Sequence, residues 1–422
     1  MLCCLAACKP APSAGNEPGA APAPPAARAA PVTISALIWA PDWPAEILQI
    51  AADFSRLNPD VKVDIEFMSG NSVEENLKPR VAARKLPDLM SVNPNPYAAE
   101  LADRGMLADV GASSAWQRLL PGLKADWMSP NGKRFGIAGG VAATLIYYNK
   151  TMFRQAGIEQ LPTNFKQFLE VCERLKKAGH TPVYWSGGFP NLIANGAFSF
   201  GFANNIAATT PDWKARIADG TLALDNAAGA DIFGKILTVA QRGYTQPDLM
   251  HSGYDDAIQG FVDGKAAMAF QGNWAAGSLL HPKRFEVGIF VPPWNDRGAS
   301  VPVIGSETGF AVSETANKAA AMRFLDYLTG AGFAIEQRKR RNIAPFAANG
   351  AIQAGDPQIL AYLAQIESAP VTGSPYYSML PANTIELLHR LIQDVLTHRL
   401  TPRQAAQQLE ASIRDEARSN NK

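Results

Sequence analysis

The first part of the folded chain alternates apolar runs with amphipathic stretches. Residues 32–39, 61–67 and 88–92 carry strand patterns, the first mostly apolar and the second alternating between apolar and polar positions. Apolar side chains recur every three or four residues over 44–57 and 73–84, which predicts two helices between the strands. This alternation predicts a mostly parallel sheet covered on both faces, with ligands bound at the carboxyl ends of its strands.

A less regular version of the same pattern follows and predicts a second α/β lobe. The expected strands are 145–148, 181–185 and 266–270, and the expected helices are 163–175, 255–262, 385–395 and one that begins at Pro402. Residues 272–274, Gly-Asn-Trp, form the turn after the third of these strands. Trp274 is therefore expected at the carboxyl end of a strand.

Length, charge and cysteine content narrow the classes of function. A chain of 422 residues is too long for one ordinary core, so two lobes of about 150 to 200 residues are expected. The net charge of +1 favours neither nucleic acid nor an acidic surface as partner, and it suits an uncharged ligand. Three of the four cysteines lie in the first eight residues. The body of the chain, with Cys172 alone, can therefore build neither a disulfide framework nor a cysteine metal site.

The N-terminal segment has the composition of a processed leader followed by a tether. Residues 5–8, Leu-Ala-Ala-Cys, resemble a bacterial lipobox, which predicts that residues 1–8 are a lipoprotein signal remnant and that Cys8 is lipidated. The segment before the cysteine is short for a signal peptide, so we expect the true start codon upstream; the alternative is a chance cysteine in an unstructured tail. Residues 9–31 are rich in Ala, Pro and Gly and predict a disordered linker.

Short motifs spread over the chain after Pro31 follow one characteristic order. They lie at 54–59, 87–89, 105–107, 135–137, 147–150, 153–158, 162–168, 261–268, 272–274 and 319–328. Each motif is loose alone, but together they are specific. The chain resembles the extracellular solute-binding proteins of carbohydrate ABC importers, the family 1 group that includes the maltose-binding protein. The resemblance implies an α/β, type II periplasmic-binding-protein fold, in which two α/β lobes joined by a hinge enclose a ligand cleft.

The resemblance also implies a division of the chain and a set of partners. It places the N-terminal lobe at 32–140 and 294–327 and the C-terminal lobe at 141–293 and 328–422, with crossings near 137–143, 291–294 and 325–330. Members of the family capture a sugar by hinge closure and deliver it to membrane permease subunits. We therefore expect a monomeric, periplasmic or extracytoplasmic, lipid-anchored protein that is not an enzyme, binds no nucleic acid and needs no cofactor or metal.

A sugar site needs aromatic faces for the C–H groups of the sugar and planar polar side chains for its hydroxyls. Position in the family pattern selects candidates for the N-terminal wall, namely Trp39, Asp42, Trp43, Asn93, Asn95, Tyr97 and Glu307. For the opposite wall it selects Trp274 first, and then Trp185 and Tyr376 or its neighbour Tyr377. The alternative for each aromatic residue is an ordinary core or surface position, and for each acid a solvated residue or a helix cap.

Three other interpretations stay open on sequence alone. The chain has no Gly-x-Ser-x-Gly, His-Glu-x-x-His or Cys-x-x-Cys motif, although a glycosidase could still bring two distant carboxylates together in a cleft. A lipid-anchored sensor that feeds a signalling receptor would use the same hinge. A polyamine or glycerol phosphate ligand would require a cleft rich in one sign of charge. The basic run at 338–341 predicts a solvated face, or alternatively a contact with the permease or an anionic ligand.

Overall fold

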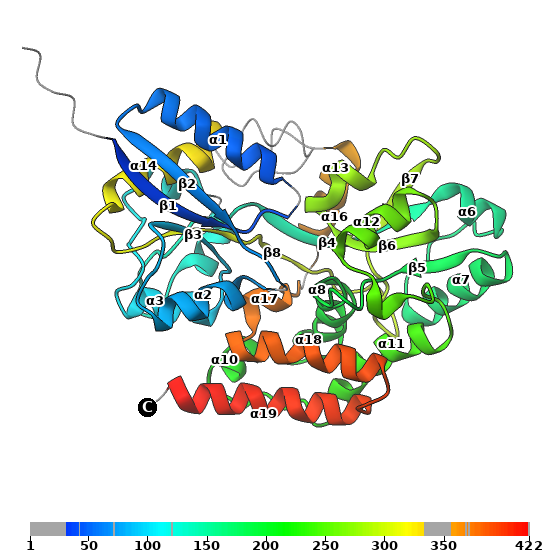
Figure 1. Ribbon diagram of the computed structural model, residues 1–422. Helices are drawn as coiled ribbons and strands as arrows, with labels where there is room; N and C mark the ends of the chain where they lie inside the picture. Colours follow the sequence, from blue (N-terminus) through cyan, green and yellow to red (C-terminus); the bar gives the residue numbers. More distant parts are fainter. Residues whose placement is uncertain are drawn as a thin grey trace, which may run out of the picture.

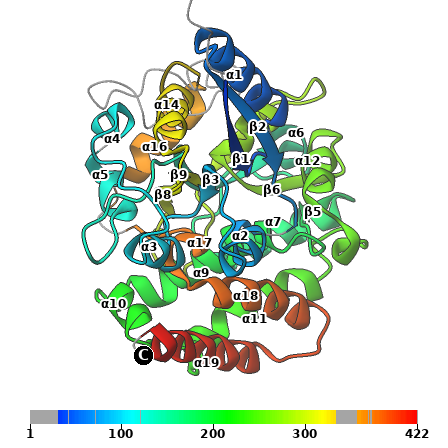
Figure 2. The ribbon, with the colours of Figure 1, turned by 60° about the vertical axis from the view of Figure 1, so that its left-hand side comes forward.

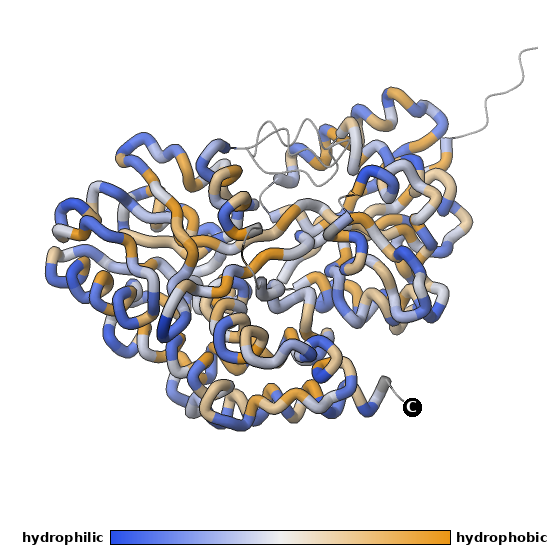
Figure 3. Tube along the Cα trace, turned by 180° about the vertical axis from the view of Figure 1, so that it is seen from behind, coloured by the Kyte–Doolittle hydropathy of each residue, from blue (hydrophilic) through white to orange (hydrophobic). Residues whose placement is uncertain are grey.

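Two β-sheets, one on each side of the molecule, organise the computed structural model (Figure 1). The structure describes residues 31–41, 43–70, 72–119, 121–332, 356–367, 369 and 372–420. Two large clusters of buried hydrophobic side chains fill the interior, and Figure 3 shows the apolar strands inside a more hydrophilic outer layer of helices. We call the sheet that contains β1, with the helices packed on it, the first lobe, and the part built on the other sheet the second lobe.

The first sheet has the strand order β2-β1-β3-β9. Its strands are β1 (Val32–Ile38), β2 (Val61–Phe67), β3 (Leu89–Val92) and β9 (Gly309–Val312). Strands β2, β1 and β3 are parallel, whereas β9 runs antiparallel to β3. The helices of this lobe are α1 (Pro44–Leu57), α2 (Val73–Ala82), α3 (Pro96–Asp103), α4 (Ser114–Arg118), α5 (Pro121–Lys124), η1 (Ala125–Trp127) and α14 (Lys318–Tyr327). The predicted parallel βαβ pattern is present here.

The second sheet is mostly antiparallel, which differs from the prediction. Its strands are β4 (Val141–Asn149), β5 (Thr181–Tyr184), β6 (Ala266–Gly272), β7 (Val287–Phe290) and β8 (Ile304–Ser306). Only β5 and β6 pair in parallel, while β6, β7 and β8 all run antiparallel to β4. For β8 the reason is topological, because β4 carries the chain into this lobe and β8 carries it back along β4.

Helices of the second lobe pack around its sheet, and the last two extend beneath the first lobe as well (Figures 1 and 2). They are α6 (Lys150–Gln155), α7 (Phe165–Lys177), α8 (Asn191–Ile193), η2 (Ala194–Phe198), α9 (Ser199–Phe202), η3 (Ala203–Ala207), α10 (Trp213–Ala218), α11 (Ala227–Gln241), η4 (Leu249–His251), α12 (Tyr254–Val262), η5 (Asn273–Ala275), α13 (Ala276–Leu279), α16 (Pro357–Glu367), α17 (Tyr376–Met379), α18 (Ala382–Leu396) and α19 (Pro402–Asn420). Figures 1 and 2 place α18 and α19 beneath α2 and α3 of the first lobe. Within the described part of the chain, no helix is both long and apolar enough to span a membrane.

Within the described residues, two extended segments connect the lobes side by side. The chain leaves the first lobe after Ile137, which bridges to Phe310, and its next residues pair with β8 through Ala142 and Gly305. The expected crossing at 291–294 is placed differently, because Trp294 is fully buried in the second lobe against Phe270. The chain therefore returns farther along, at β8.

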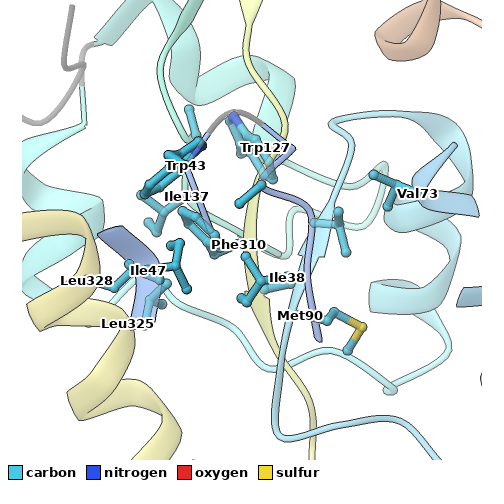
Figure 4. Close-up of a cluster of buried hydrophobic side chains, with 14 of the residues drawn as sticks. Ile38, Trp43, Ile47, Val73, Met90, Trp127, Ile137, Phe310, Leu325 and Leu328 are labelled. Carbon is cyan, nitrogen blue, oxygen red and sulfur yellow. The ribbon is translucent and has the colours of Figure 1, made fainter. Parts of the chain in front are cut away.

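The segment after α14 also packs differently from the expected division at residue 328. Residues Leu328–Gly332 form a wide helical turn, η6, that continues from α14. Leu328 lies close to Leu325 and to Ile47 of α1 in the core of the first lobe (Figure 4). An added Cβ at Gly332 would lie 2.6 Å from Ile50 of α1. Residues 328–332 therefore pack with the first lobe, and the exact lobe boundaries stay a prediction.

Candidate functional site

A cleft between the two sheets is lined by side chains from both lobes. Its empty volume is about 820 Å³, part of which is open to solvent. The first lobe contributes the loop after β1, the first turn of α2, the loop after β3 and the segment between β8 and β9. The second lobe contributes α8 and the segment before it, η2, α12, the turn after β6, and α17. The two-sided lining is that of a small-molecule site.

Aromatic rings form much of the lining. They are Trp39, Trp43, Phe189, Tyr254, Trp274, Phe310, Tyr376 and Tyr377. Trp274 is only partly buried, and it lines the cleft together with residues of the first lobe. Phe189 and Tyr254 meet edge to face, with ring centroids 5.6 Å apart. Trp43 is 6% exposed and lies close to Ile137 and Phe310 (Figure 4), which fixes its ring at the base of the first wall.

A buried polar network stands behind the first wall. Glu74 Oε1 accepts hydrogen bonds from Asn93 Nδ2 at 2.9 Å and from Asn95 Nδ2 at 2.7 Å. Asn93 Oδ1 in turn accepts a hydrogen bond from the Thr308 hydroxyl at 2.6 Å. The network joins α2, the loop after β3 and the chain's return between β8 and β9. It therefore holds three separate parts of the wall in one arrangement.

Helix capping explains why Glu74 and Asn95 occupy these positions. Ser72 begins α2 and accepts a hydrogen bond from the Glu75 backbone N–H at 3.1 Å, which places Glu74 in the first turn. Asn95 begins α3, and its Oδ1 accepts from the Ala98 backbone N–H at 3.1 Å. The Asn95 amide therefore caps one helix with its oxygen and binds Glu74 with its nitrogen.

Glu307 reaches the cleft from the segment that connects the lobes. Its backbone N–H donates to the Gly140 carbonyl at 2.9 Å. Close packing here requires glycine at position 139, because an added Cβ would lie 2.1 Å from the Thr308 backbone carbonyl oxygen, and Gly140 packs directly against the Glu307 side chain. The carboxylate of Glu307 is thus held beside the hinge strands.

Amide and phenol groups line the wall of the cleft that the second lobe forms. Asn195 is 5% exposed, and its Nδ2 donates to Asn191 Oδ1 at 2.9 Å. Tyr377 donates its hydroxyl to the Ser306 carbonyl at 3.2 Å, which joins α17 to β8. The Tyr376 hydroxyl lies 2.9 Å from His389 Nε2, so this hydroxyl is engaged within the second lobe. The ring of Tyr376 is then the part that faces the cleft.

The cleft is acidic. Glu74 and Glu307 are the charged side chains among its described lining residues, which include no Lys, Arg or His. Burial raises the pKa of the Glu74 carboxyl, although the hydrogen bonds from Asn93 and Asn95 oppose this effect. Burial, and then the charge of Glu74, also raises the pKa of Tyr97 to about 12. No cluster of His, Cys, Asp and Glu side chains suited to a metal ion occurs in the described residues.

The structure brings six of the ten predicted ligand-binding residues to this cleft. They are Trp39, Trp43, Asn93, Trp274, Glu307 and Tyr376. Asn95 lies behind the wall and supports Glu74, and Tyr97 is partly buried on α3 outside the lining. Trp185 is 2% exposed and packs edge to face against Phe270 in the core of the second lobe, because β5 ends inside that core rather than at its surface. Asp42, Cys8 and the basic run at 338–341 lie outside the described residues.

Several lining residues were not among the sequence candidates. They include Glu74, Phe189, Asn191, Asn195, Tyr254 and Phe310. For Glu74 a signal was available, because the first turn of a helix that follows a parallel strand lies at the carboxyl edge of the sheet. The lining residues at 189–195 and 254 lie where the pattern of apolar and polar positions did not indicate a binding site.

Comparison with known proteins gives this cleft its context. The Multiple sugar-binding protein of Streptococcus mutans is 25% identical over 298 residues, 68% of each chain. An sn-glycerol-3-phosphate-binding periplasmic protein of Brucella abortus is 23% identical over 185 residues, 43% of this chain and 40% of the other. Among solved structures, a chitin oligosaccharide binding protein has the same fold, with a TM-score of 0.80 and 20% identity over 92% of this chain and 99% of that one.

The family assignment rests on a longer match. The sequence model described as "Bacterial extracellular solute-binding protein" covers residues 40–335, which include every strand of both sheets except β1, and both connecting segments. That match extends over well more than half of the 422 residues. The chain therefore belongs to the bacterial extracellular solute-binding proteins.

Proposed function

We propose that this protein is the substrate-binding component of an ABC sugar importer and that it captures a mono- or oligosaccharide in the cleft by hinge closure. The observation that carries the proposal is the lining of the cleft. Aromatic rings from both lobes flank amide and carboxylate groups, and no cationic side chain stands among the described lining residues. Such a lining suits the C–H faces and the hydroxyl groups of an uncharged sugar.

A sugar phosphate fits this lining less well. The relative from Brucella abortus is named for sn-glycerol 3-phosphate, and a phosphate group is bound in proteins by Arg, Lys or backbone N–H donors. The two charged groups described in the cleft are carboxylates, which repel a phosphate. The relative from Streptococcus mutans, named for multiple sugars, covers more of the chain and agrees with the lining. We therefore assign the site to neutral saccharides.

The proposal includes a location and partners. The lipobox-like residues 5–8 and the Ala/Pro-rich residues 9–31 favour a lipid anchor at Cys8 on a bacterial membrane, with the folded lobes held outside the cytoplasm. The closed, sugar-loaded monomer would then deliver its ligand to the permease subunits. A sensor that feeds a signalling receptor would bind the same ligand, and the two are separated by whether permease and ATPase genes or a histidine kinase gene lie beside this one.

A thermal-shift screen tests sugar binding directly. A ligand that binds only the native state raises the melting temperature by mass action. We expect at least one saccharide from a panel of mono- and oligosaccharides to raise the melting temperature of the wild-type protein. We expect the Trp274→Ala variant to lose that rise relative to its own ligand-free state, and Trp274→Phe to keep part of it.

The control variant lacks a partly buried aromatic ring that lies outside the cleft. Phe285 packs edge to face on Phe261, with centroids 5.5 Å apart, and is not a lining residue. Phe285→Ala should therefore lower the melting temperature without changing the saccharide-induced rise. An equal rise in Trp274→Ala and wild type would remove Trp274 from the site, and no rise with any saccharide would contradict the proposed function.

A further inference from the structure

One buried side chain joins the turn after β6 to the strand that enters the second lobe. Asn273 stands between Gly272 and Trp274 in this turn and is fully buried. Its Oδ1 accepts a hydrogen bond from the Ala143 backbone N–H at 2.9 Å, and its Nδ2 donates to the Val141 carbonyl at 2.7 Å. Both groups of the amide are therefore bound to the backbone of β4.

These two backbone groups belong to the segment that connects the lobes. Residues 141–143 of β4 pair on one edge with 304–306 of β8. On the other edge, the antiparallel pairing of β4 with β6 extends only as far as Thr144 and Gly272. The carbonyl of residue 141 and the N–H of residue 143 are the two groups that one residue of a neighbouring parallel strand would bind. The Asn273 amide takes the place of that residue, so the connecting segment is hydrogen-bonded on both edges.

The same turn carries a lining residue of the cleft. An added Cβ at Gly272 would lie 2.0 Å from a ring carbon of Trp274, so the indole packs directly on the backbone of Gly272. Tyr147 of β4 donates its hydroxyl to the Gly272 carbonyl at 2.9 Å. Trp274 itself lines the cleft. β4 therefore fixes the turn at two points, through Tyr147 and through Asn273, and the indole rests on the fixed part.

We propose that Asn273 is a positioning residue of the saccharide site: it ties the turn that carries Trp274 to the connecting segment, so that the indole keeps one position relative to the hinge as the lobes close. This inference rests on the proposed function. Asn273 is not a lining residue, so it acts through Trp274 and not by contact with the ligand. An aromatic ring that is held in place before binding has less freedom to lose on binding.

The test compares Asn273→Ala with Asn273→Asp. Alanine removes both hydrogen bonds to β4. Aspartate keeps an acceptor for the Ala143 N–H, and when it is protonated it also supplies an O–H donor for the Val141 carbonyl. Burial and the neighbouring carbonyl oxygen favour the protonated form of this carboxyl. A change from pH 8.5 to pH 6 should therefore restore the donor that the substitution removes.

The matched control is Asn204→Ala. Asn204 Oδ1 accepts a hydrogen bond from the Val301 backbone N–H at 2.9 Å, and its Nδ2 donates to the Phe200 carbonyl at 2.8 Å. Asn204 is thus also an amide that bridges two backbone groups, but it lies outside the lining and outside the turn after β6. Calorimetric titration of the full chain uses D-glucose, maltose, raffinose and stachyose, and thermal unfolding is measured for each ligand-free variant.

We expect the wild type to bind at least one sugar of this set. Asn273→Ala should weaken that binding about five- to fiftyfold, whereas Asn204→Ala should leave it unchanged, although both variants melt at a lower temperature than the wild type. This comparison separates positioning from stability, because a lower melting temperature alone does not change the affinity of protein that is still folded. Relative to the wild type at the same pH, Asn273→Asp should bind weakly at pH 8.5 and regain most of its affinity at pH 6.

Each failure has a separate meaning. If Asn273→Ala binds the sugar as tightly as the wild type, the inference is wrong and the proposed function stands. The same conclusion follows if Asn204→Ala weakens binding as much as Asn273→Ala does. If Asn273→Ala does not fold, Asn273→Asp decides, and an affinity relative to the wild type that is the same at pH 8.5 and pH 6 overturns the inference. If no sugar of the set binds the wild type, the proposed function and the inference fail together.

Discussion

His389 and Tyr376 form a buried pair behind the second wall of the cleft. His389 Nε2 lies 2.9 Å from the Tyr376 hydroxyl. Burial lowers the pKa of His389 to about 4, and the charge of Arg390 acts in the same direction. In the unfolded chain this imidazole takes up a proton below about pH 6.5. The folded state therefore loses stability as the pH falls from about 6.5 towards 4.

The prediction for this residue compares wild type with His389→Gln. Glutamine can keep a hydrogen bond to Tyr376 but does not titrate. At pH 5 the wild type should have lost on the order of 2 kcal/mol of unfolding free energy through His389 alone, a loss that His389→Gln avoids. Urea unfolding at pH 7.5 and pH 5 measures the difference. Parallel pH profiles of the two proteins would show that His389 is protonated while folded.

A control histidine lies at the surface. His281 is half exposed and lies 2.8 Å from Asp356. Its ring has access to water in the folded protein, so His281→Gln replaces a histidine without disturbing the buried pair of His389 and Tyr376. We expect this variant to follow the wild-type loss of stability between pH 7.5 and pH 5.

At the scale of elements, α2 and α18 join the lobes through an ion pair. Lys78 Nζ of α2 lies 2.7 Å from Glu386 Oε1 and 2.6 Å from Asn383 Oδ1, both on α18. The two charged side chains are 27% and 25% exposed. Figures 1 and 2 show α2 above α18. Glu74 and Lys78 lie one turn apart on α2, so the helix whose first turn lines the cleft also carries the contact to the other lobe.

We expect the contact of Lys78 with α18 to help hold the cleft closed. Lys78→Met removes the charge and keeps an apolar stem, and a partly exposed ion pair contributes about 0.5 to 1 kcal/mol. If hinge closure brings α2 to α18, the variant should bind saccharide about two- to fivefold more weakly, through faster dissociation. Stopped-flow measurement of tryptophan fluorescence gives both rate constants.

The control for this experiment breaks an ion pair within one lobe. Arg323 Nη1 on α14 lies 2.7 Å from Asp60 Oδ2, and both belong to the first lobe. Arg323→Met should leave the dissociation rate unchanged, because it touches no contact between lobes. Equal rates in Lys78→Met and wild type would mean that the α2–α18 contact does not stabilise the closed state.

At the scale of the whole molecule, the local pattern predicted elements more fully than it predicted topology. Strands β1, β2, β3, β5 and β6 and helices α1, α2, α7, α12, α18 and α19 lie close to their expected ranges. The predicted family is confirmed by the match over residues 40–335. The antiparallel pairing of the second sheet was not predictable from periodicity, because alternation of side chains along a strand carries no information on the direction of its neighbour.

The candidate site shows where local pattern stops being informative. Trp39 and Trp274 were proposed from their positions in the family pattern, and each follows a strand of its sheet. Trp185 also follows a strand, but its ring packs against Phe270 and is buried in the core of the second lobe. Glu74 depends on contacts with residues 19 and 21 positions away, and Asn195 on a helical stretch with no family marker.

The most direct test is a crystal structure of the protein with the saccharide that gives the largest thermal shift. The structure should show one saccharide between the two sheets, with a ring face on Trp274. A saccharide bound outside this cleft, or a cleft in which the aromatic rings fill the space between the lobes and leave no room for it, would contradict the account.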